Sequence, residues 1–491
     1  MLENDYLCTE LWNLMESCAL KYDKTNPKSI FDYATRLVGQ TLRSIIGDQA
    51  IAAYNLRGKG GFNQMIEKLY FEYDVNSCPE PDFREAGVEL KGTALKELKD
   101  KSLQIKERLV IDMIDYCEVV NHTFEDSLFY RKCRLMLLLF YLYQKDVDQV
   151  DWEFIYVVLW KIPSKDLLII KHDYQVIINK IKRGEAHLLS EGDTEYLGAC
   201  RKGQKGDPER KQPYSDILAA KRAFSLKPSY MRTVLNYIKK CGKRAVINYQ
   251  INTGRVANGE SIVETKELQE KSFEQIILDK FVPYKGMTYA QICDKLGIKV
   301  SKAKNRYALI AQRIIMNGPG NPNKTDEFLK AGLQMKTIRV EAGGNIEQSM
   351  SFENIDYSEV YENDNWFDSR LYEIFSGRFL FVIFKADGDL IRFEDGDSDN
   401  SYSFDRAFFW TMPQEDLLVA EEYWNNIRKC VLDNHIAPKY FFKLQDHKHF
   451  HVRPKARVAT DLAENPNGGY VKKYCYWFNN EYIQKIEREN R

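Results

Sequence analysis

Residues 81–91 (PDFREAGVELK) place two carboxylates and a lysine at a spacing that could support hydrolysis at a phosphate. If GVELK forms a strand, Glu89 and Lys91 project from one face, and the residues between them point into the core. Asp82 arrives from the preceding turn and can bring a second carboxylate to Glu89. Two carboxylates and a backbone carbonyl make a hard oxygen site suited to Mg²⁺, beside which a lysine can orient an attacking water. The segment therefore predicts a Mg²⁺-dependent hydrolytic site.

The same residue types also occur on ordinary surface strands. There, Glu89 and Lys91 would form a salt bridge and do no chemistry. The motif is short, and matches to short patterns arise by chance. Agreement from other parts of the chain is needed to favour the catalytic interpretation.

The elements around this segment follow from apolar spacing and from glycine and proline positions. Helices are predicted at residues 31–46, 62–72, 228–240 and 272–281, and mostly buried strands at residues 87–93, 107–113 and 133–143. Pro228 would open the third of these helices. The order of elements predicts a mixed α/β fold.

Segments on both sides of the carboxylates occur in the order of a known family. Residues 59–67 (KGGFNQMIE), 86–91 (AGVELK) and 124–132 (FEDSLFYRK) resemble a helix, the metal-binding strand and a lysine-bearing segment of the MutH-type family of GATC-specific endonucleases. The resemblance is collinear over residues 31–240. It implies the PD-(D/E)XK restriction-endonuclease-like fold.

The resemblance implies roles for five residues of the candidate active site. Asp82 and Glu89 would bind Mg²⁺, and Lys91 would handle the water. Glu67 and Lys132 would support the metal and the scissile phosphate, with Glu67 as a further metal ligand. Taken singly, Glu67 would most often be a solvated helix charge and Lys132 a charge at a sheet edge. Their order and spacing favour the catalytic roles.

Two downstream segments, residues 195–202 (EYLGACRK) and 222–227 (RAFSLK), resemble DNA-contacting elements of the family. The DNA-binding candidates that they imply are Lys202, Arg222, Ser225 and Lys227. The position of Ser225 resembles one that a tyrosine occupies in the nicking branch of the family. That tyrosine senses the N6 position of adenine. A small serine is expected to leave room there for a methyl group. Alternatively, Ser225 satisfies a local backbone group and discrimination is made elsewhere.

The chain also repeats itself. Residues 284–298 resemble residues 37–51, and residues 325–337 resemble residues 81–93 with an offset of 245 that aligns their Ala-Gly pairs. This offset carries Asp82, Glu89, Lys91, Glu67 and Lys132 to Glu327, Gln334, Lys336, Gln312 and Gly377, with Ser376 as an alternative to Gly377. Two carboxylates become amides, which cannot supply the charge that holds Mg²⁺ beside a phosphate. The second copy is therefore expected to be catalytically inactive.

Features of the second copy that could contact DNA are better retained. Residues 452–456 (VRPKA) resemble the element around Lys202, so Lys455 takes its place with Arg453 nearby. Residues 476–480 (YWFNN) follow where RAFSLK stands in the first half. We expect a second DNA-binding domain, an effector domain, because a retained basic residue can still meet phosphates or base edges. The alternative is a structural duplicate with ordinary surface lysines.

Charge is distributed unevenly, although the formal net charge is zero. Residues 201–244 hold thirteen Lys or Arg against three acidic residues, whereas residues 351–400 hold four against thirteen. One region can thus attract phosphate while the whole chain stays neutral. Two solvated charged faces without a partner are the alternative.

The cysteines and histidines give no strong metal signature. The ten cysteines form no close pairs of the kind zinc sites use, so reduced and mostly buried thiols are expected. His447, His449 and His451 alternate and would share one strand face. They predict either a metal site or, with more weight, a solvated or DNA-facing strand.

The domain prediction is a catalytic MutH-like domain at residues 1–245, a linker at 246–270 and an inactive MutH-like effector domain at 271–491. The longest apolar run, residues 135–143, is too short to span a membrane and reads as a buried strand. The N-terminus lacks the basic and apolar regions of a signal peptide. A cytoplasmic protein without a membrane partner is expected.

The resemblance implies a type II restriction endonuclease that cleaves both strands of DNA at GATC with Mg²⁺. Its expected partners are GATC-containing duplex DNA, a second copy of the chain on DNA, and a methyltransferase that protects host DNA. One alternative is a methyl-directed mismatch-repair nicking endonuclease that needs an activating partner. Another is a noncatalytic GATC-binding regulator, which the intact set of Asp82, Glu89 and Lys91 disfavours.

Overall fold

The computed structural model describes residues 21–55, 61–73, 80–98, 101–203, 207–241, 260–446, 448–456, 458 and 460–491. Contacts divide the chain into two units, one formed by residues 1–167 and 222–256 and the other by residues 168–221 and 257–491. The predicted boundary near residue 245 therefore misses residues 168–221, which group with the second unit. Most of the predicted linker lies outside the described residues, but its residues Thr265–Glu270 form helix α10.

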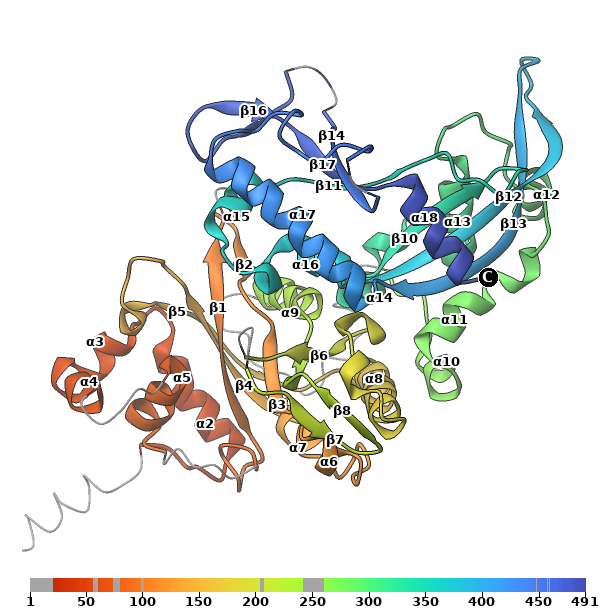
Figure 1. The fold of residues 1–491 in the computed structure, drawn as a ribbon. Helices are drawn as coiled ribbons and strands as arrows, with labels where there is room; N and C mark the ends of the chain where they lie inside the picture. The colour runs from red at the N-terminus through yellow and green to blue at the C-terminus, as the bar shows by residue number, and fades with distance from the viewer. Residues whose placement is uncertain are drawn as a thin grey trace, which may run out of the picture. The chain divides into compact units, whose positions relative to one another are not determined.

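A four-stranded sheet forms the centre of the first unit (Figure 1). Its strand order is β2 (Leu103–Ile105), β1 (Glu89–Glu97), β4 (Met136–Leu142) and β5 (Phe154–Trp160). β1 runs parallel to β4, whereas the other two pairings are antiparallel. All but the last residue of β4 are buried. This confirms the long apolar run as a buried strand.

Short helices pack against this sheet instead of the single helix predicted for residues 31–46. The chain forms α2 (Pro27–Ala34), the 3-10 helix η1 (Thr35–Leu37), α3 (Leu42–Ile46) and α4 (Asp48–Asn55). The break lies at Gly39, whose φ of +77° is a left-handed conformation that glycine adopts without strain. The second predicted helix is confirmed as α5 (Phe62–Met65), which continues into the π-helix η2 (Ile66–Tyr70).

The rest of the first unit carries a second, antiparallel pair of strands. β3 (Leu109–Met113) pairs with β9 (Arg222–Leu226). The helix after β9, α9 (Pro228–Cys241), begins at its proline as predicted. The remaining elements are α6 (Tyr116–Val119), α7 (Leu128–Cys133) and the 3-10 helix η3 (Gln149–Asp151).

The second unit begins within α8 (Ser164–Lys182) and includes strand β6 (Leu197–Arg201) and the hairpin of β7 (Arg210–Gln212) and β8 (Ser215–Ala219). The short helices of this segment are η4 (Ala186–Leu188) and η5 (Glu191–Asp193). Arg378 holds the segment to the remainder of the unit, because its guanidinium contacts the buried carboxylate of Glu195 at 2.7 Å.

Two further sheets organise the remainder of the second unit. One contains β10 (Gln334–Val340), β12 (Arg378–Arg392) and β13 (Ser398–Thr411), and the other contains β11 (Met350–Asn354), β17 (Tyr474–Phe478) and β14 (Phe450–Pro454). β15 (Leu462–Glu464) and β16 (Tyr470–Lys472) form a separate hairpin. The other helices are α11 (Phe273–Asp279), η7 (Val282–Tyr284), α12 (Tyr289–Lys295), α13 (Arg306–Met316), η8 (Pro322–Lys324), α14 (Asp326–Ala331), α15 (Tyr357–Glu362), η9 (Trp366–Asp368), α16 (Arg370–Phe375), α17 (Gln414–Leu432) and α18 (Asn480–Glu489).

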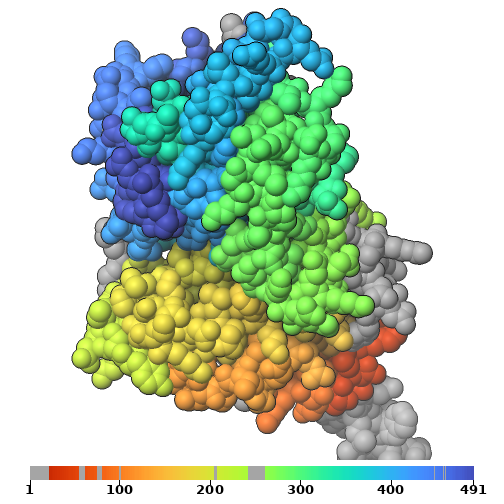
Figure 2. Space-filling model, turned by 90° about the vertical axis from the view of Figure 1, so that its right-hand side faces the viewer, coloured from red at the N-terminus to blue at the C-terminus, as the bar shows by residue number. Residues whose placement is uncertain are grey.

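Matching backbone contacts recur in the two halves of the sequence. Gly39 donates its N–H to the carbonyl of Phe154 on β5, and Gly286 donates to the carbonyl of Phe404 on β13, both at 2.8 Å. Gly286 has the same φ of +77° as Gly39, and each glycine stands two residues before a threonine that caps a helix. Figure 2 shows the green surface of this second-half segment beside the light-blue β13. These contacts agree with the internal repeat read from the sequence.

A buried polar pair also recurs. The Tyr230 hydroxyl on α9 donates to Asp166 on α8 at 3.0 Å, and the Tyr482 hydroxyl on α18 donates to Asp416 on α17 at 2.8 Å. α8 and α17 each contain 19 residues. The same tie between a long helix and the last helix thus occurs in each half.

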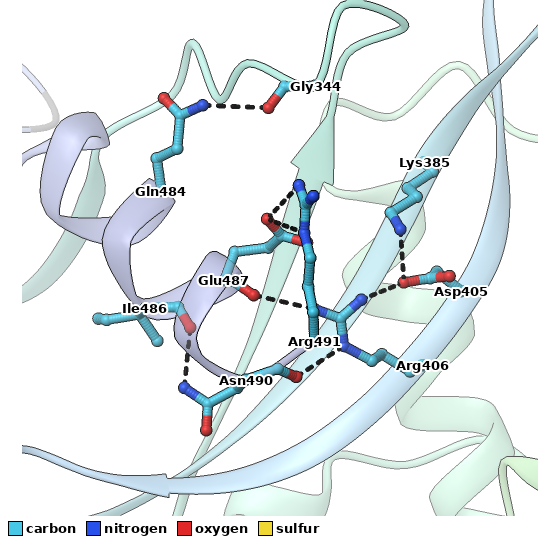
Figure 3. A network of polar contacts seen from close by, with 9 residues as sticks. All are labelled: Gly344, Lys385, Asp405, Arg406, Gln484, Ile486, Glu487, Asn490 and Arg491. Carbon is cyan, nitrogen blue, oxygen red and sulfur yellow. Dashed lines mark hydrogen bonds and ion pairs between the residues drawn. The ribbon is translucent and has the colours of Figure 1, made fainter.

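The C-terminal helix α18 is tied to β13 by a network of charges (Figure 3). Glu487 is fully buried and accepts hydrogen bonds at 3.0 Å from both Arg406 and Arg491. Arg406 also contacts Asp405, which pairs with Lys385 at 3.1 Å. A buried carboxylate is tolerated only when it is paired in this way, so the network fixes the end of the chain.

Among the described residues, no helix is both long and apolar enough to cross a membrane. Six cysteines with described side chains carry free thiols, of which five are buried and Cys117 is exposed. This agrees with the expectation of reduced, mostly buried thiols.

Candidate active site

A tight turn brings Asp82 to the start of β1. Phe83 and Val88 form an antiparallel bridge, and the turn between them closes at Gly87, where φ is +64°. Because of this turn, the Asp82 carboxylate accepts a hydrogen bond from the backbone N–H of Leu90 at 2.7 Å. Asp82 is thereby fixed beside Glu89, as the sequence predicted.

β1 presents Glu89 and Lys91 on the same face, as the alternation of a strand requires. The Lys91 Nζ lies 2.7 Å from Glu89 Oε1. Glu89 itself is 3% exposed, and its other carboxylate oxygen, Oε2, has no hydrogen-bond partner among the described residues. Leaving a buried carboxylate oxygen unpaired is costly, and a cation at this position would satisfy it.

Gly92 allows the helix that carries Glu67 to approach β1. A Cβ atom at Gly92 would lie 2.1 Å from Oδ1 of Asn63 on α5 and 3.1 Å from the ring of Tyr141. Glu67 follows one turn later, on η2. Sequence reasoning did not identify Gly92 or Asn63, although a glycine inside a strand is a known sign of close backbone approach.

Lys132 enters from α7 and is held by an acid that the sequence analysis missed. Its Nζ lies 2.9 Å from Asp112 Oδ1, and both side chains are less than one-fifth exposed. Asp112 belongs to β3, in a segment that resembles an ordinary buried strand. Only the pairing of distant elements places it beside the lysine.

The five predicted residues form one electrostatic group. Burial and the nearby charge of Asp82 raise the pKa of Glu67 to about 7. Burial also raises the pKa values of Asp82 and Glu89, while Lys91 and Lys132 oppose that change through their positive charges. Raised carboxylate pKa values in a cluster of this kind are typical of functional sites.

The donor set suits a hard cation such as Mg²⁺. Asp82 and the unpaired oxygen of Glu89 supply carboxylate ligands, to which backbone carbonyls and water are normally added. Within the described ranges, however, no three His, Cys, Asp or Glu side chains lie close enough to hold a metal ion together. The part of Glu67 as a third carboxylate ligand therefore stays a prediction.

A pocket of about 710 Å³ opens beside the turn that carries Asp82. Its basic lining residues are Arg84, Arg131, Arg134 and Lys161, and its acidic ones are Glu80, Glu85 and Glu125. Arg131 is paired with Glu80 at 2.8 Å. A polyanion bound at the carboxylates of Asp82 and Glu89 could therefore also reach basic side chains of this pocket.

The four DNA-binding candidates of the first half differ in exposure. Lys202 follows β6 and is partly exposed. Arg222, Ser225 and Lys227 lie on or just after β9 and are all buried. The Ser225 hydroxyl has no hydrogen-bond partner among the described residues, so no contact with a local backbone group is seen there.

The second half keeps the glycine but not the chemistry, and its residues before Gly332 form helix α14 where the first half has a turn. Gly332, like Gly87, has a φ of +64°, and Glu327 takes the place of Asp82. Glu327 is buried and accepts hydrogen bonds from Ser261 and the backbone of Ile262. Gln334 starts β10 as Glu89 starts β1.

Helix α13 corresponds to the helix of Glu67. Phe62 on α5 contacts the Tyr141 ring at 4.9 Å between centroids, and Tyr307 on α13 contacts Phe384 at 5.0 Å. This match has the same offset of 245 and places Gln312 in the position of Glu67. The amide expected there from the sequence is thus on the corresponding helix.

The predicted counterpart of Lys132 is wrong. α7 and α16 each contain six residues and are capped by Ser127 and Ser369, respectively, so the fifth residue of α16, Ile374, matches Lys132. A constant offset pointed to Gly377 or Ser376 instead. It failed because the two halves differ in length before this helix and again before the next strand. Ile374 is buried and apolar, so the second half has no cation at this position.

Lys455 takes the position of Lys202. Lys202 donates its backbone N–H to Lys221, and Lys455 donates to Lys473, at 2.8 and 3.0 Å. In the register of β17, residues 474–479 correspond to RAFSLK. Trp477 therefore corresponds to Ser225. Arg453 lies 5.3 Å from the centroid of the Trp477 ring and is partly exposed.

The histidine cluster does not form an open strand face. His451 is 1% exposed, bonds to Asn479 and stacks on Trp477, and burial lowers its pKa to about 4. His449 contacts Asp416 at 3.3 Å, and His447 lies outside the described residues. The expectation of a solvated or DNA-facing face is therefore wrong for His451, because β14 turns that side chain into the protein.

Comparison with known proteins adds an independent finding. Residues 71–173 match the model of a family described as DNA mismatch repair enzyme MutH. The chain is 28% identical over 506 aligned residues to the type II restriction enzyme Sau3AI of Staphylococcus aureus. This alignment covers 93% of this chain and 97% of that enzyme. It is 26% identical over 183 residues to the DNA mismatch repair protein MutH of Shewanella woodyi, covering 36% of this chain and 77% of that protein.

Proposed function

We infer that the chain is a MutH-type site-specific deoxyribonuclease, and we propose that it acts as a type II restriction endonuclease cleaving both DNA strands at GATC with Mg²⁺. The match to a MutH model and the alignment with a restriction enzyme over nearly the whole chain support the enzyme class. The observation that carries the chemistry is the buried, unpartnered Oε2 of Glu89 beside Asp82 and Lys91.

The residues of the site have distinct parts in the proposed reaction. Asp82 and Glu89 would hold Mg²⁺, which when bound lowers the pKa of water and offsets charge on the scissile phosphate. Lys91 is fixed by Glu89 and can orient the attacking water. Lys132, held by Asp112, can contact a phosphate oxygen. Glu67 can accept a proton near neutral pH because burial raises its pKa to about 7.

We propose that the second half is an inactive copy that binds DNA. Its matching turns, helix caps and Tyr–Asp pair support the duplication. Gln334 and Ile374 remove a metal ligand and a cation from its equivalent site, whereas Lys455 keeps the position of Lys202. Such a half has DNA-binding groups without the means to cleave.

Plasmid digestion tests the proposal. We expect purified protein to linearise a plasmid with one GATC site only when Mg²⁺ is present, and to leave a plasmid without GATC intact. Nicking that stops at the open circle would instead favour the mismatch-repair type of enzyme. Binding without cleavage at any Mg²⁺ concentration would favour a noncatalytic regulator.

The finer proposals concern methylation and partners. A buried, small Ser225 leads us to propose cleavage whether or not the GATC adenine is methylated, because no bulky side chain stands at that position. Digestion of matched plasmids with and without this methylation tests it, and full protection by the methyl group would contradict it. We further propose that two copies act together on DNA in the cytoplasm, and that a methyltransferase protects host sites at another base.

A further inference from the structure

Two lysines of the second unit reach the same pair of residues on β11. Lys336, on β10, donates from Nζ to the carbonyl of Ser351 at 2.9 Å. Lys455, just after β14, donates from Nζ to the carbonyl of Phe352 at 2.9 Å and to the hydroxyl of Ser351 at 3.2 Å. The two ammonium groups therefore converge although they come from different sheets.

Neither ammonium group has a carboxylate partner in the described part of the chain. Lys91, the counterpart of Lys336, is paired with Glu89 at 2.7 Å. In the second half, the position that corresponds to Glu89 holds the neutral Gln334. The nearby Glu353 is already held by Arg370 through two hydrogen bonds of 3.0 and 2.6 Å.

The positive charge of this pair is costly as it stands. Burial and the charge of Lys455 lower the pKa of Lys336 to about 8, so the amine is still mainly protonated at neutral pH. Cys475 offers no negative charge, because burial raises the pKa of its thiol. Lys455 is exposed, so an anion from solvent can reach the pair and offset its charge.

We propose that Lys336 and Lys455 form a phosphate-binding site that works without a metal ion and holds a backbone phosphate of duplex DNA. Compared with the centre around Glu89, the carboxylate is replaced here by the neutral Gln334, and the two lysines contact the phosphate directly. The choice of DNA as the source of the phosphate rests on the proposed function. Phosphate recognition itself rests only on the lysine pair.

Metal-free binding to DNA tests the site. The full-length protein would carry Lys202→Met, which removes the first-half counterpart of Lys455. It would be titrated in EDTA with a labelled GATC duplex at several NaCl concentrations. In that background we expect Lys336→Met and Lys455→Met each to weaken binding about 3- to 10-fold. In the double variant, the negative slope of log K against log salt should also become shallower by about 1, as loss of one phosphate contact predicts.

Control variants separate this effect from general charge loss and from misfolding. Lys299→Met removes one positive charge from an exposed side chain of the same unit and should change affinity less than twofold. Lys336→Arg keeps the charge and should retain most of the affinity. Thermal unfolding of each variant shows that it is folded.

Inorganic phosphate distinguishes the two sources of the ligand. If the site binds phosphate, millimolar phosphate should raise the Tm of the parent by more than that of the double variant. If phosphate raises the Tm in this way but the double variant binds DNA as tightly as the parent, the lysine pair binds phosphate and its ligand is free phosphate. A double variant that matches Lys299→Met in affinity, salt slope and phosphate response overturns the proposal. Mg²⁺-dependent cleavage, measured separately, reports on the proposed function alone.

Discussion

The centre around Glu89 and its counterpart around Gln334 share a backbone and differ in charge. Both follow a glycine with a φ of +64°, and both lie at the start of a strand paired in parallel with the next long strand. In one, buried carboxylates face two lysines. In the other, Lys336 has no carboxylate partner among the residues that the structure describes. The comparison teaches that similar backbones can carry different side-chain chemistry, because backbone geometry depends on glycine and apolar positions and not on the polar side chains.

The largest expected effect comes from giving the first centre the amide of the second. Glu89→Gln should reduce cleavage to below about 10⁻³ of the parent rate, because a neutral oxygen cannot hold the metal. DNA binding in the absence of metal should stay within a few-fold. Plasmid cleavage and duplex binding, measured together, check both. Appreciable cutting by Glu89→Gln would refute the assignment of the site.

A second exchange tests how the helix of Glu67 is positioned. Thr337 and Ala308 stand at the positions of Gly92 and Asn63, by the offset of 245. Gly92→Thr should slow cleavage about 100-fold, because the new side chain meets Asn63 and Tyr141 and moves the helix. Adding Asn63→Ala should restore part of the rate by making room. The matched control is Thr337→Gly, which should leave cleavage unchanged; an unaffected Gly92→Thr enzyme would contradict this role.

Lys336, which has no carboxylate partner among the described residues and donates only to the carbonyl of Ser351, predicts a pH-dependent cost in stability. Its folded pKa of about 8 lies below the ordinary 10.5, so the unfolded chain binds more protons across that interval and stability rises with pH through it. At pH 7 the cost is fully present, and Lys336→Met should stabilise the second unit by about 1–3 kcal/mol. The gain should shrink toward pH 10. Urea unfolding at both pH values measures it, and a gain that does not change with pH would contradict the explanation.

The smallest expected effect compares the repeated Tyr–Asp pairs. Tyr230→Phe and Tyr482→Phe each remove one buried hydrogen bond and leave Asp166 or Asp416 without it. Each should cost about 1–2 kcal/mol in the free energy of unfolding. If the two pairs are equivalent, the two substitutions should cost similar amounts. Urea unfolding measures both losses, and a clear loss for only one of the two variants would show that the pairs are not equivalent.

Much of the active site could be read from the sequence because its central part is local. Asp82, Glu89 and Lys91 lie within ten residues on a turn and the strand that follows it, so alternation along the strand nearly fixes their geometry. Glu67 and Lys132 required the resemblance to a family, because nothing in their own surroundings marks them. Asp112 was missed, since its contact with Lys132 joins two elements that are distant in the sequence.

The sequence by itself also predicted the buried strand β4, and it has amides in the second half where an offset of 245 aligns Glu67 and Glu89. Both observations depend on residue identity and short-range spacing. Tertiary structure alone decided four other points. Residues 168–221 group with the second unit, Ile374 replaces Lys132, His451 is buried, and Lys336 and Lys455 converge on β11. Each of these depends on contacts between residues far apart along the chain. Such contacts are set by how whole elements pack, so neither a fixed offset nor a local pattern could reveal them.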